Sequence, residues 1–308
     1  MEKRRIGSLS VSLVGLGCNN FGIRLDQPRT TQVVHAALDA GIDFFDTADI
    51  YGGTHSEEFL GRALAGKRER AIIATKFGLP LDEQRKSASP EYVRRAVDDS
   101  LRRLGTERID LYQLHRPDPA VPIADTLGAL DDLVKQGKVR EIGASNFSVA
   151  QIREAEAAVR AGGAHFVSIQ NEYSLLERSV EADVLPECAS RNIAFLPYFP
   201  LASGLLTGKY RAGQAAPEGT RLTEPQSQLR ARFLGDKQLA RAEALAKFAA
   251  KRSHSLLDLA FSWLAARSEV RSVIAGATSA AQIQANVEAV AWQLDADELG
   301  EVDRLAPR

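Results

Sequence analysis

The chain has 308 residues, of which 44% are hydrophobic and 26% are charged, a composition typical of a folded globular protein and not of a disordered or fibrous one. Its 39 Lys and Arg residues balance 40 Asp and Glu residues, so no basic excess is present to neutralise phosphates and nucleic acid is excluded as a main partner. Two cysteines, Cys18 and Cys188, are too few for a disulfide framework and favour a reducing compartment.

The first residues of the chain carry no recognisable targeting signal. Residues 1–17 have a charged start followed by a short apolar run that Ser8, Ser10 and Ser12 interrupt. This run lacks both the apolar core of a signal peptide and the roughly 20 apolar residues of a membrane span. We therefore expect a cytoplasmic protein with no membrane partner, in which residues 2–13 form a β-hairpin.

Short apolar runs rich in β-branched residues alternate with longer stretches of helical periodicity. Eight runs are predicted strands: 12–17, 42–47, 71–76, 109–115, 139–145, 166–173, 193–198 and 270–276. Strands that are apolar on both faces and separated by helices indicate a parallel sheet covered by helices. Eight such units predict a single α/β domain over residues 1–308, a (β/α)₈ TIM barrel with an N-terminal β-hairpin and an extra C-terminal helix. A doubly wound open sheet is the structural alternative.

Helix start and stop signals follow several of these strands. Thr54 and Glu57 have the spacing of a capping box, in which each side chain bonds the other residue's backbone. Ser89 is a predicted N-cap, and Gly105 is predicted to end the same helix. The stretch 199–236 is rich in Gly and Pro and weakly periodic, so we interpret it as a functional loop between a strand and a helix.

Polar residues end the predicted strands at the edge where a parallel barrel places its active site. Three consecutive, otherwise hydrophobic runs end in Asp46, Lys76 and His115, which packing does not explain. Later strands end in Ser145, Asn146, Gln170 and Tyr198.

The types of these residues suggest proton transfer. Asp46 is the natural counter-charge for Lys76, because a buried ammonium is costly unless it is paired; taken alone, the pair is equally explained as a structural one. Tyr51 lies in the loop after Asp46, and a nearby lysine cation is expected to lower the pKa of its phenol from about 10 and make it a usable proton donor. His115 then orients a substrate carbonyl or relays a proton, with a satisfied buried histidine as the alternative.

Seven groups of residues resemble the motifs of the aldo-keto reductases and occur in that family's order. They are DTADIYG (46–52), ATKFG (74–78), LHRPD (114–118), IGASNF (142–147), QNEYSL (170–175), PYFPL with GLLTGKY (197–210), and GATS (276–279). The resemblance runs from about residue 2 to residue 305. The chain is similar in particular to the branch that includes the potassium-channel β subunits.

This resemblance implies a catalytic tetrad of Asp46, Tyr51, Lys76 and His115, with Tyr51 as general acid. It also implies a nicotinamide cofactor, NADPH with NADH as the alternative, bound extended across the barrel mouth without a Rossmann domain. The implied cofactor-binding residues are Gly17, Cys18, Asn19, Asp46, Ser145, Asn146, Gln170, Tyr198, Phe199, Pro200, Leu201, Ala202, Ser203, Lys209, Arg221, Gly276, Ala277, Thr278, Ser279, Gln282 and Asn286.

Several positions depart from the family's pattern around the cofactor. Gly276 and Gln282 stand where many members carry Lys or Arg beside the adenosine 2′-phosphate, and Arg221 is the candidate to supply the missing charge. Phe199 replaces a frequent Ser, which removes a side-chain contact to the pyrophosphate. Asn19–Asn20 replace bulkier residues and predict a more polar pocket wall.

The function predicted from these residues is NADPH-dependent reduction of an aldehyde or ketone, a small-molecule carbonyl substrate, to an alcohol. The alternative from another class is a cofactor-sensing regulatory subunit with little turnover; His115 favours the enzyme, because the channel-associated relatives tend to replace it. A lyase or isomerase on the same barrel would need metal ligands, and His35, His55, His165 and His254 lack metal-ligand spacing, so no metal site is expected. The sequence sets neither the natural carbonyl nor the oligomeric state.

Overall fold

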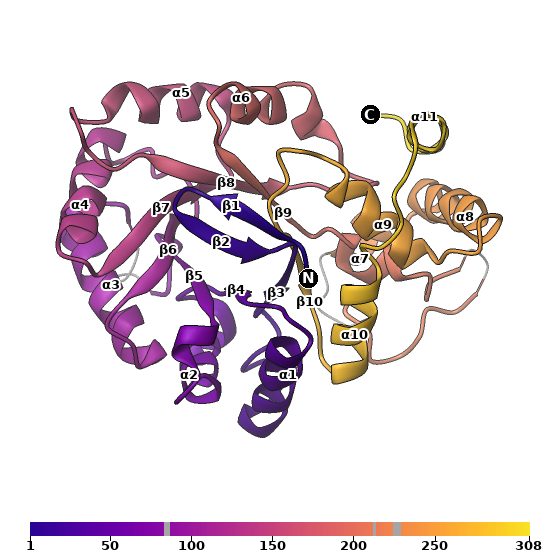
Figure 1. Ribbon diagram of the computed structural model, residues 1–308, viewed down its shortest axis with the longest axis horizontal. Helices are drawn as coiled ribbons and strands as arrows, with labels where there is room; N and C mark the ends of the chain where they lie inside the picture. The colour runs from indigo at the N-terminus through magenta and orange to yellow at the C-terminus, as the bar shows by residue number, and fades with distance from the viewer. Residues whose placement is uncertain (83–86, 212–213, 224–228) are drawn as a thin grey trace.

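A computed structural model describes residues 1–82, 87–211, 214–223 and 229–308, and in it eight parallel strands form a barrel surrounded by helices (Figure 1). In chain order the barrel strands are β3 (Val14–Gly17), β4 (Phe44–Asp46), β5 (Ile72–Phe77), β6 (Ile109–Leu114), β7 (Val139–Ser145), β8 (Phe166–Glu172), β9 (Ala194–Tyr198) and β10 (Val273–Gly276). From β3 to β9 each strand pairs with the next, and β10 pairs with β3 on its other side. A parallel bridge between Phe195 and Val270 joins β9 to the segment before β10 and closes the ring. The predicted barrel is confirmed.

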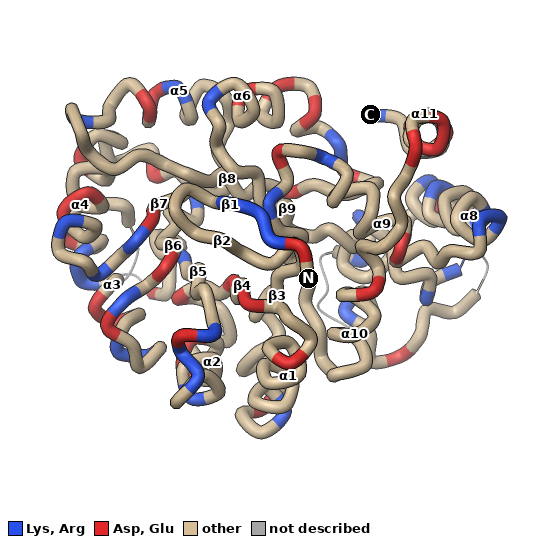
Figure 2. The backbone as a smooth tube through the Cα atoms, in the orientation of Figure 1, with Lys and Arg blue, Asp and Glu red and all other residues tan. Residues whose placement is uncertain are grey.

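Helices form the outer layer of the barrel (Figure 1). They are α1 (Gln27–Asp39), α2 (His55–Ala63), α3 (Pro90–Leu104), α4 (Ile123–Lys135), α5 (Val149–Ala158), α6 (Val184–Ser190), α7 (Leu229–Phe233), α8 (Asp236–Ala250), α9 (Leu256–Ala265), α10 (Ala280–Glu288) and the predicted extra C-terminal helix α11 (Ala296–Leu305). Basic and acidic positions are interspersed along these helices, in keeping with the balanced composition (Figure 2). Within the described ranges, no helix is both long and apolar enough to cross a membrane.

The predicted N-terminal hairpin covers the end of the barrel where the strands begin (Figure 1). Its two strands pair antiparallel: β1 (Lys3–Ile6) and β2 (Leu9–Ser12). Ile6, Leu9 and Val11 share a buried cluster with side chains of the barrel strands: Phe44, Ala74, Leu111, Val167, Ala194, Leu196 and Ile274. The hairpin therefore seals this end with apolar packing and leaves the opposite end for chemistry.

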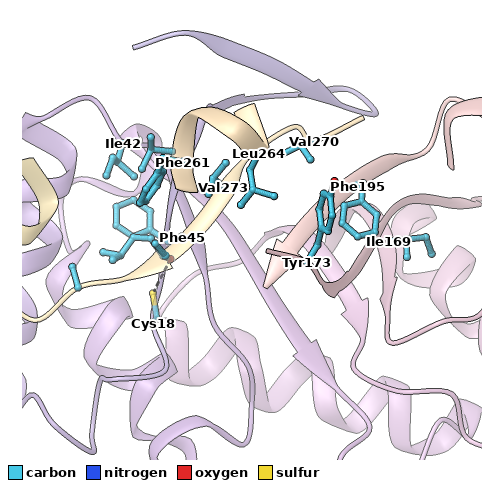
Figure 3. Close-up of a cluster of buried hydrophobic side chains, with 14 of the residues drawn as sticks. Cys18, Ile42, Phe45, Ile169, Tyr173, Phe195, Phe261, Leu264, Val270 and Val273 are labelled. Carbon is cyan, nitrogen blue, oxygen red and sulfur yellow. Dashed lines mark hydrogen bonds between the residues drawn. The ribbon is translucent and has the colours of Figure 1, made fainter. Parts of the chain in front are cut away.

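A larger apolar core lies between the strands and the surrounding helices. Figure 3 shows part of it, with Phe45 from β4 and Phe261 from α9 among the buried side chains. Tyr173 and Phe195 pack edge to face with ring centroids 5.8 Å apart. Fully burying a side chain of this size contributes about 1.5–3 kcal/mol, so this layer fixes the helices against the barrel.

The helix signals in the sequence are confirmed in one case and wrong in another. The Ser89 side chain accepts a hydrogen bond from the backbone of the third residue after it, and Gly105 ends α3 in the left-handed conformation. Thr54, however, has φ +86° and makes no capping hydrogen bond. Glu57 is buried and accepts hydrogen bonds from Thr75 Oγ1 and from Arg103 Nε, each at 2.6 Å. These charge-assisted partners replace the expected capping box.

Candidate active site

The barrel interior changes from apolar to polar toward the carboxyl ends of the strands. Alternate residues of a strand face the same side, so residues two apart both point inward. Asp46 thus follows the inward-facing Phe44, and Lys76 follows Ala74. Gln113 on β6 belongs to the same buried layer. The strands therefore place ionisable groups opposite the hairpin.

Asp46 and Lys76 are in direct contact, as the sequence led us to expect. Lys76 Nζ donates to Asp46 Oδ2 at 2.6 Å and to the Thr47 carbonyl oxygen at 2.9 Å. The other oxygen of Asp46 accepts from Gln170 Nε2 at 2.9 Å and from Gln113 Nε2 at 3.3 Å. Burial disfavours the lysine charge, but Asp46 and the Tyr51 hydroxyl outweigh this effect and raise the pKa of Lys76. The ammonium is therefore a fixed cation.

Tyr51 lies close to both this cation and His115. Its ring centroid is 5.2 Å from Lys76 Nζ and 5.8 Å from the His115 ring, which it meets at 80°. The chain turns directly after the tyrosine at Gly52, whose φ is +61° and whose missing Cβ would lie 2.5 Å from the Phe21 carbonyl oxygen. A glycine is required there, because any side chain would push apart the two loops that hold the phenol.

The pKa of Tyr51 corrects one expectation. Burial is the largest influence and raises the pKa above its ordinary value of 10. Lys76 lowers the pKa through its charge and a hydrogen bond, as expected, whereas the charge of Asp46 raises it. The net shift is upward, so the predicted lowering is wrong for the free protein. Tyr51 is consequently protonated at neutral pH.

His115 is a neutral, incompletely bonded histidine. Burial and the charges of Lys76 and Arg116 lower its pKa to about 3. Its Nδ1 atom is buried and has no hydrogen-bond partner in the described residues. This observation argues against the satisfied-histidine alternative, and the low pKa argues against an imidazolium that relays a proton. A neutral imidazole at the mouth of the barrel is suited to donating one hydrogen bond to an uncharged oxygen.

A cavity of about 520 Å³ opens over these side chains, within the size range of small-molecule sites. Asp46, Tyr51 and His115 line it, whereas Lys76 lies fully buried behind them. The predicted cofactor residues that also line it are Cys18, Asn19, Ser145, Asn146, Gln170, Tyr198, Phe199, Pro200, Leu201, Ser203, Lys209, Arg221, Gly276, Thr278, Gln282 and Asn286. Those that do not line it are Gly17, Ala202, Ala277 and Ser279.

Polar side chains near the tyrosine hold one another in place. The Tyr198 hydroxyl donates to Asn146 Oδ1 at 2.8 Å. Asn146 Nδ2 donates to Ser145 Oγ and to the His115 carbonyl oxygen, both at 3.0 Å. Ser145 Oγ in turn donates to the Gln170 carbonyl oxygen at 2.7 Å. This network fixes the wall beside His115.

The loop after β9 gathers backbone strain beside the cavity. Phe199, Ala202 and Ser203 have positive φ values of 51°, 45° and 56°, a conformation that costs on the order of 1–3 kcal/mol for each residue other than glycine. Ser203 Oγ is buried without a partner among the described residues. Backbone N–H groups in such turns form concave anion sites. Part of the predicted functional loop 199–236, at 212–213 and 224–228, lies outside the described residues.

Three cations converge on one part of the cavity. The pKa of Lys209 is lowered by burial and by the charges of Arg24 and Arg221. Arg221 Nη2 also donates to Asn20 Oδ1 at 3.2 Å, which ties the long loop to the loop after β3. Sequence reasoning proposed Arg221 but missed Arg24, because an isolated arginine in a turn carries no periodic signal. Gln113 was missed as well, although its place two residues before His115 was a usable signal.

Side chains of the protein already bond backbone groups at the start of α10. Ser279 is its N-cap and accepts from the Gln282 backbone. Gln282 Oε1 accepts from the Thr278 N–H at 2.8 Å, so a side chain of the protein occupies a backbone donor of one predicted cofactor-binding residue. An anion here has to displace this amide oxygen.

Taken together, the donor set fits a dinucleotide. The cavity combines an amide-rich wall, a strained loop with an unpartnered buried hydroxyl, and a group of cations at a distinct place. In the described residues, the only acidic side chain that lines it is Asp46, which Lys76 neutralises. Phosphate groups are therefore attracted and not repelled.

Comparison with known proteins places this chain in a family. The model of the aldo/keto reductase family matches residues 13–307. The chain is 34% identical over 305 residues to probable aldo-keto reductase 1 of Glycine max, which covers 96% of this chain and 86% of that protein. It is 34% identical over 308 residues to aldo-keto reductase YhdN of Bacillus subtilis (strain 168), covering 96% and 90%.

Solved structures agree. The glycerol dehydrogenase AKR11B4 of Gluconobacter oxydans superposes with a TM-score of 0.83 at 34% identity, covering 98% of this chain and 94% of that one. An aldo/keto reductase from Klebsiella pneumoniae, solved with NADP and acetate, gives 0.77 at 28% identity, covering 97% and 92%. The chain belongs to the aldo/keto reductase family and is an oxidoreductase. Its place in the potassium-channel β-subunit branch stays a prediction.

Proposed function

We propose that this protein reduces a small aldehyde or ketone with NADPH, and that Asp46, Tyr51, Lys76 and His115 carry the reaction. The observation that carries the proposal is the position of the Tyr51 phenol, close to both a fixed lysine cation and a neutral histidine at the mouth of a cation-bearing cavity. The Klebsiella pneumoniae relative, which was solved with NADP, supports the same cofactor here.

Each end of the cavity takes a different part of the cofactor. Ser145, Asn146 and Gln170 hold the carboxamide of the nicotinamide, and Tyr198 covers one face of the ring. The loop 199–203 and Lys209 hold the pyrophosphate. Arg24 and Arg221 add positive charge for the remaining phosphate, which favours NADPH over NADH. When bound, the reduced nicotinamide supplies the hydride.

The chain's own residues supply the proton and the orientation. His115 donates a hydrogen bond to the carbonyl oxygen and holds the carbonyl carbon toward the ring. Tyr51 is protonated at neutral pH and gives its proton to the same oxygen as negative charge develops there. Lys76 stabilises the phenolate that remains, and Asp46 keeps the lysine charged and in place. The lysine cation therefore stabilises the negative charge that Tyr51 carries once its proton has been transferred.

The substitution Tyr51→Phe tests this assignment. We expect the consumption of NADPH with generic aldehydes to fall by at least about two orders of magnitude, within the range attributed to a general acid. NADPH binding, measured by fluorescence titration, is expected to persist. Tyr112→Phe is the matched control, because this hydroxyl is also buried but lies outside the cavity. Unchanged turnover in Tyr51→Phe would refute the role.

The same assay separates the regulatory alternative. A cofactor-sensing subunit binds NADPH and consumes almost none with any aldehyde. In that case wild type and Tyr51→Phe behave alike in both measurements.

A further inference from the structure

Arg116 stands at the rim of the cavity, next to the groups that handle the carbonyl. It follows His115 directly at the end of β6, and the His115 N–H donates to the Phe77 carbonyl oxygen at 2.9 Å, which continues the strand pairing to this point. The Arg116 side chain is exposed and lines the cavity together with Tyr51 and Leu79. The backbone just before Arg116 is therefore held by the barrel, and Arg116 begins the bend that follows β6.

The charge of Arg116 acts at the carbonyl end and not at the phosphate end. It lowers the pKa of His115 and contributes in the same direction at Tyr198. Lys209 instead is influenced by Arg24 and Arg221. Arg116 is thus a further positive side chain of the cavity besides Lys209, Arg24 and Arg221, and its charge acts on His115.

No side chain among the described residues neutralises Arg116. Across residues 1–82, 87–211, 214–223 and 229–308, its guanidinium makes no hydrogen bond or ion pair. Asp46 is committed to Lys76. Glu172, which also acts on Tyr198, is held at both oxygens by Arg232, at 2.8 and 2.9 Å. None of the described residues therefore supplies an anion beside Arg116, which leaves its guanidinium available to a ligand.

We propose that Arg116 binds an anionic group of the substrate, so that the preferred substrates are aldehydes or ketones that carry a carboxylate or a phosphate. This inference rests on the proposed reductase function and deepens it. A guanidinium presents a planar fork of donors that matches the two oxygens of such a group. Because Arg116 and His115 both line the cavity, one small substrate can place its carbonyl at His115 and its anionic group at Arg116.

Matched aldehydes test the proposal on the full-length protein with NADPH. We compare 4-carboxybenzaldehyde with 4-methylbenzaldehyde, and glyceraldehyde 3-phosphate with glyceraldehyde. Wild type is expected to prefer the charged member of at least one pair by about tenfold or more in kcat/KM, mainly through KM. The pair with the larger preference identifies carboxylate or phosphate as the group bound.

Variants then assign this preference to one residue. Arg116→Gln is expected to abolish most of it, and Arg116→Lys to retain part of it, because lysine keeps the charge but loses the fork. Arg62→Gln, an exposed arginine of α2, is the control for net charge and keeps the wild-type ratio. A charged-to-neutral ratio that is the same in wild type and Arg116→Gln would overturn the proposal.

A binding measurement separates this proposal from the proposed function. Calorimetric titration of benzoate and of inorganic phosphate into the protein saturated with NADP is expected to show binding of at least one, which Arg116→Gln weakens by about tenfold and added salt weakens further. Anion binding through Arg116 without reduction of any aldehyde would sink the reductase and leave the anion site standing. Reduction of the charged and the neutral member of each pair with equal kcat/KM would refute the anion site and leave the reductase standing.

Discussion

Replacing Lys76 with Met removes the cation that stabilises the Tyr51 phenolate. The lysine nitrogen is 5.2 Å from the centre of the phenol ring. Coulomb's law at an effective dielectric constant of about 20 gives about 3 kcal/mol at this distance, equivalent to about two pKa units. We therefore expect Lys76→Met to lower kcat for carbonyl reduction by about two orders of magnitude. In alcohol oxidation, where the phenolate is the base, the ascending limb of the pH profile reports the pKa of Tyr51 and moves up by about two units.

A second variant separates electrostatics from folding in this experiment. Lys76→Met leaves Asp46 buried without its counter-charge, which costs about 3–5 kcal/mol of stability. Adding Asp46→Asn removes that charge and is expected to recover much of the melting temperature without restoring turnover. Absorbance of the reduced cofactor follows the rate, and thermal denaturation follows the fold. Wild-type turnover in either variant, or recovery of the rate together with stability, would refute the reasoning.

Three further predictions concern His115, Glu57 and the cationic end of the cavity. The pKa of His115 is about 3 in the folded protein and about 6.5 in the unfolded chain, so protonation of the unfolded chain destabilises the fold below pH 6.5. The free energy of unfolding should therefore fall by about 1.4 kcal/mol for each pH unit between 6.5 and 3 on account of this residue. In urea denaturation, the free energy of unfolding of His115→Gln should depend less on pH over this range. Glu57→Gln weakens the bond to the Arg103 guanidinium and should lower the free energy of unfolding by about 3–5 kcal/mol in the same assay. The control Glu58→Gln, at a half-exposed carboxylate, should lower it by only about 0.3 kcal/mol. Lys209→Gln should weaken NADPH and NADH alike by about tenfold in fluorescence titrations, whereas a deficit confined to NADPH would place this lysine at the 2′-phosphate.

The fold followed from the sequence because its signal repeats. Eight apolar runs, each followed by a helix, leave few alternatives to a closed parallel barrel, and the inward layer that holds Asp46 and Lys76 follows from the period of two within a strand. Their contact was predictable because a lysine in such a layer requires a counter-charge.

Features that depend on loops and on burial were not predictable in this way. The capping pattern at Thr54 failed because the turn at Gly52 rotates the backbone and Glu57 finds stronger partners across the fold. The direction of the Tyr51 pKa shift depends on how completely the phenol loses water, which the spacing of residues does not encode. Arg24 meets Lys209 only through the folding of two distant loops.

Closure of the ring couples the first barrel strand, β3, to β10, the barrel strand that is synthesised after all the others. Val14 on β3 pairs with Val273 on β10, and Ser272 Oγ donates to the Ser12 carbonyl oxygen across 260 positions. Until β10 has emerged from the ribosome, β3 has an open edge with unpaired backbone groups, a template for association with other nascent chains. Truncation before β10 therefore creates two such edges, and we expect the truncated product to aggregate and not to form a smaller barrel.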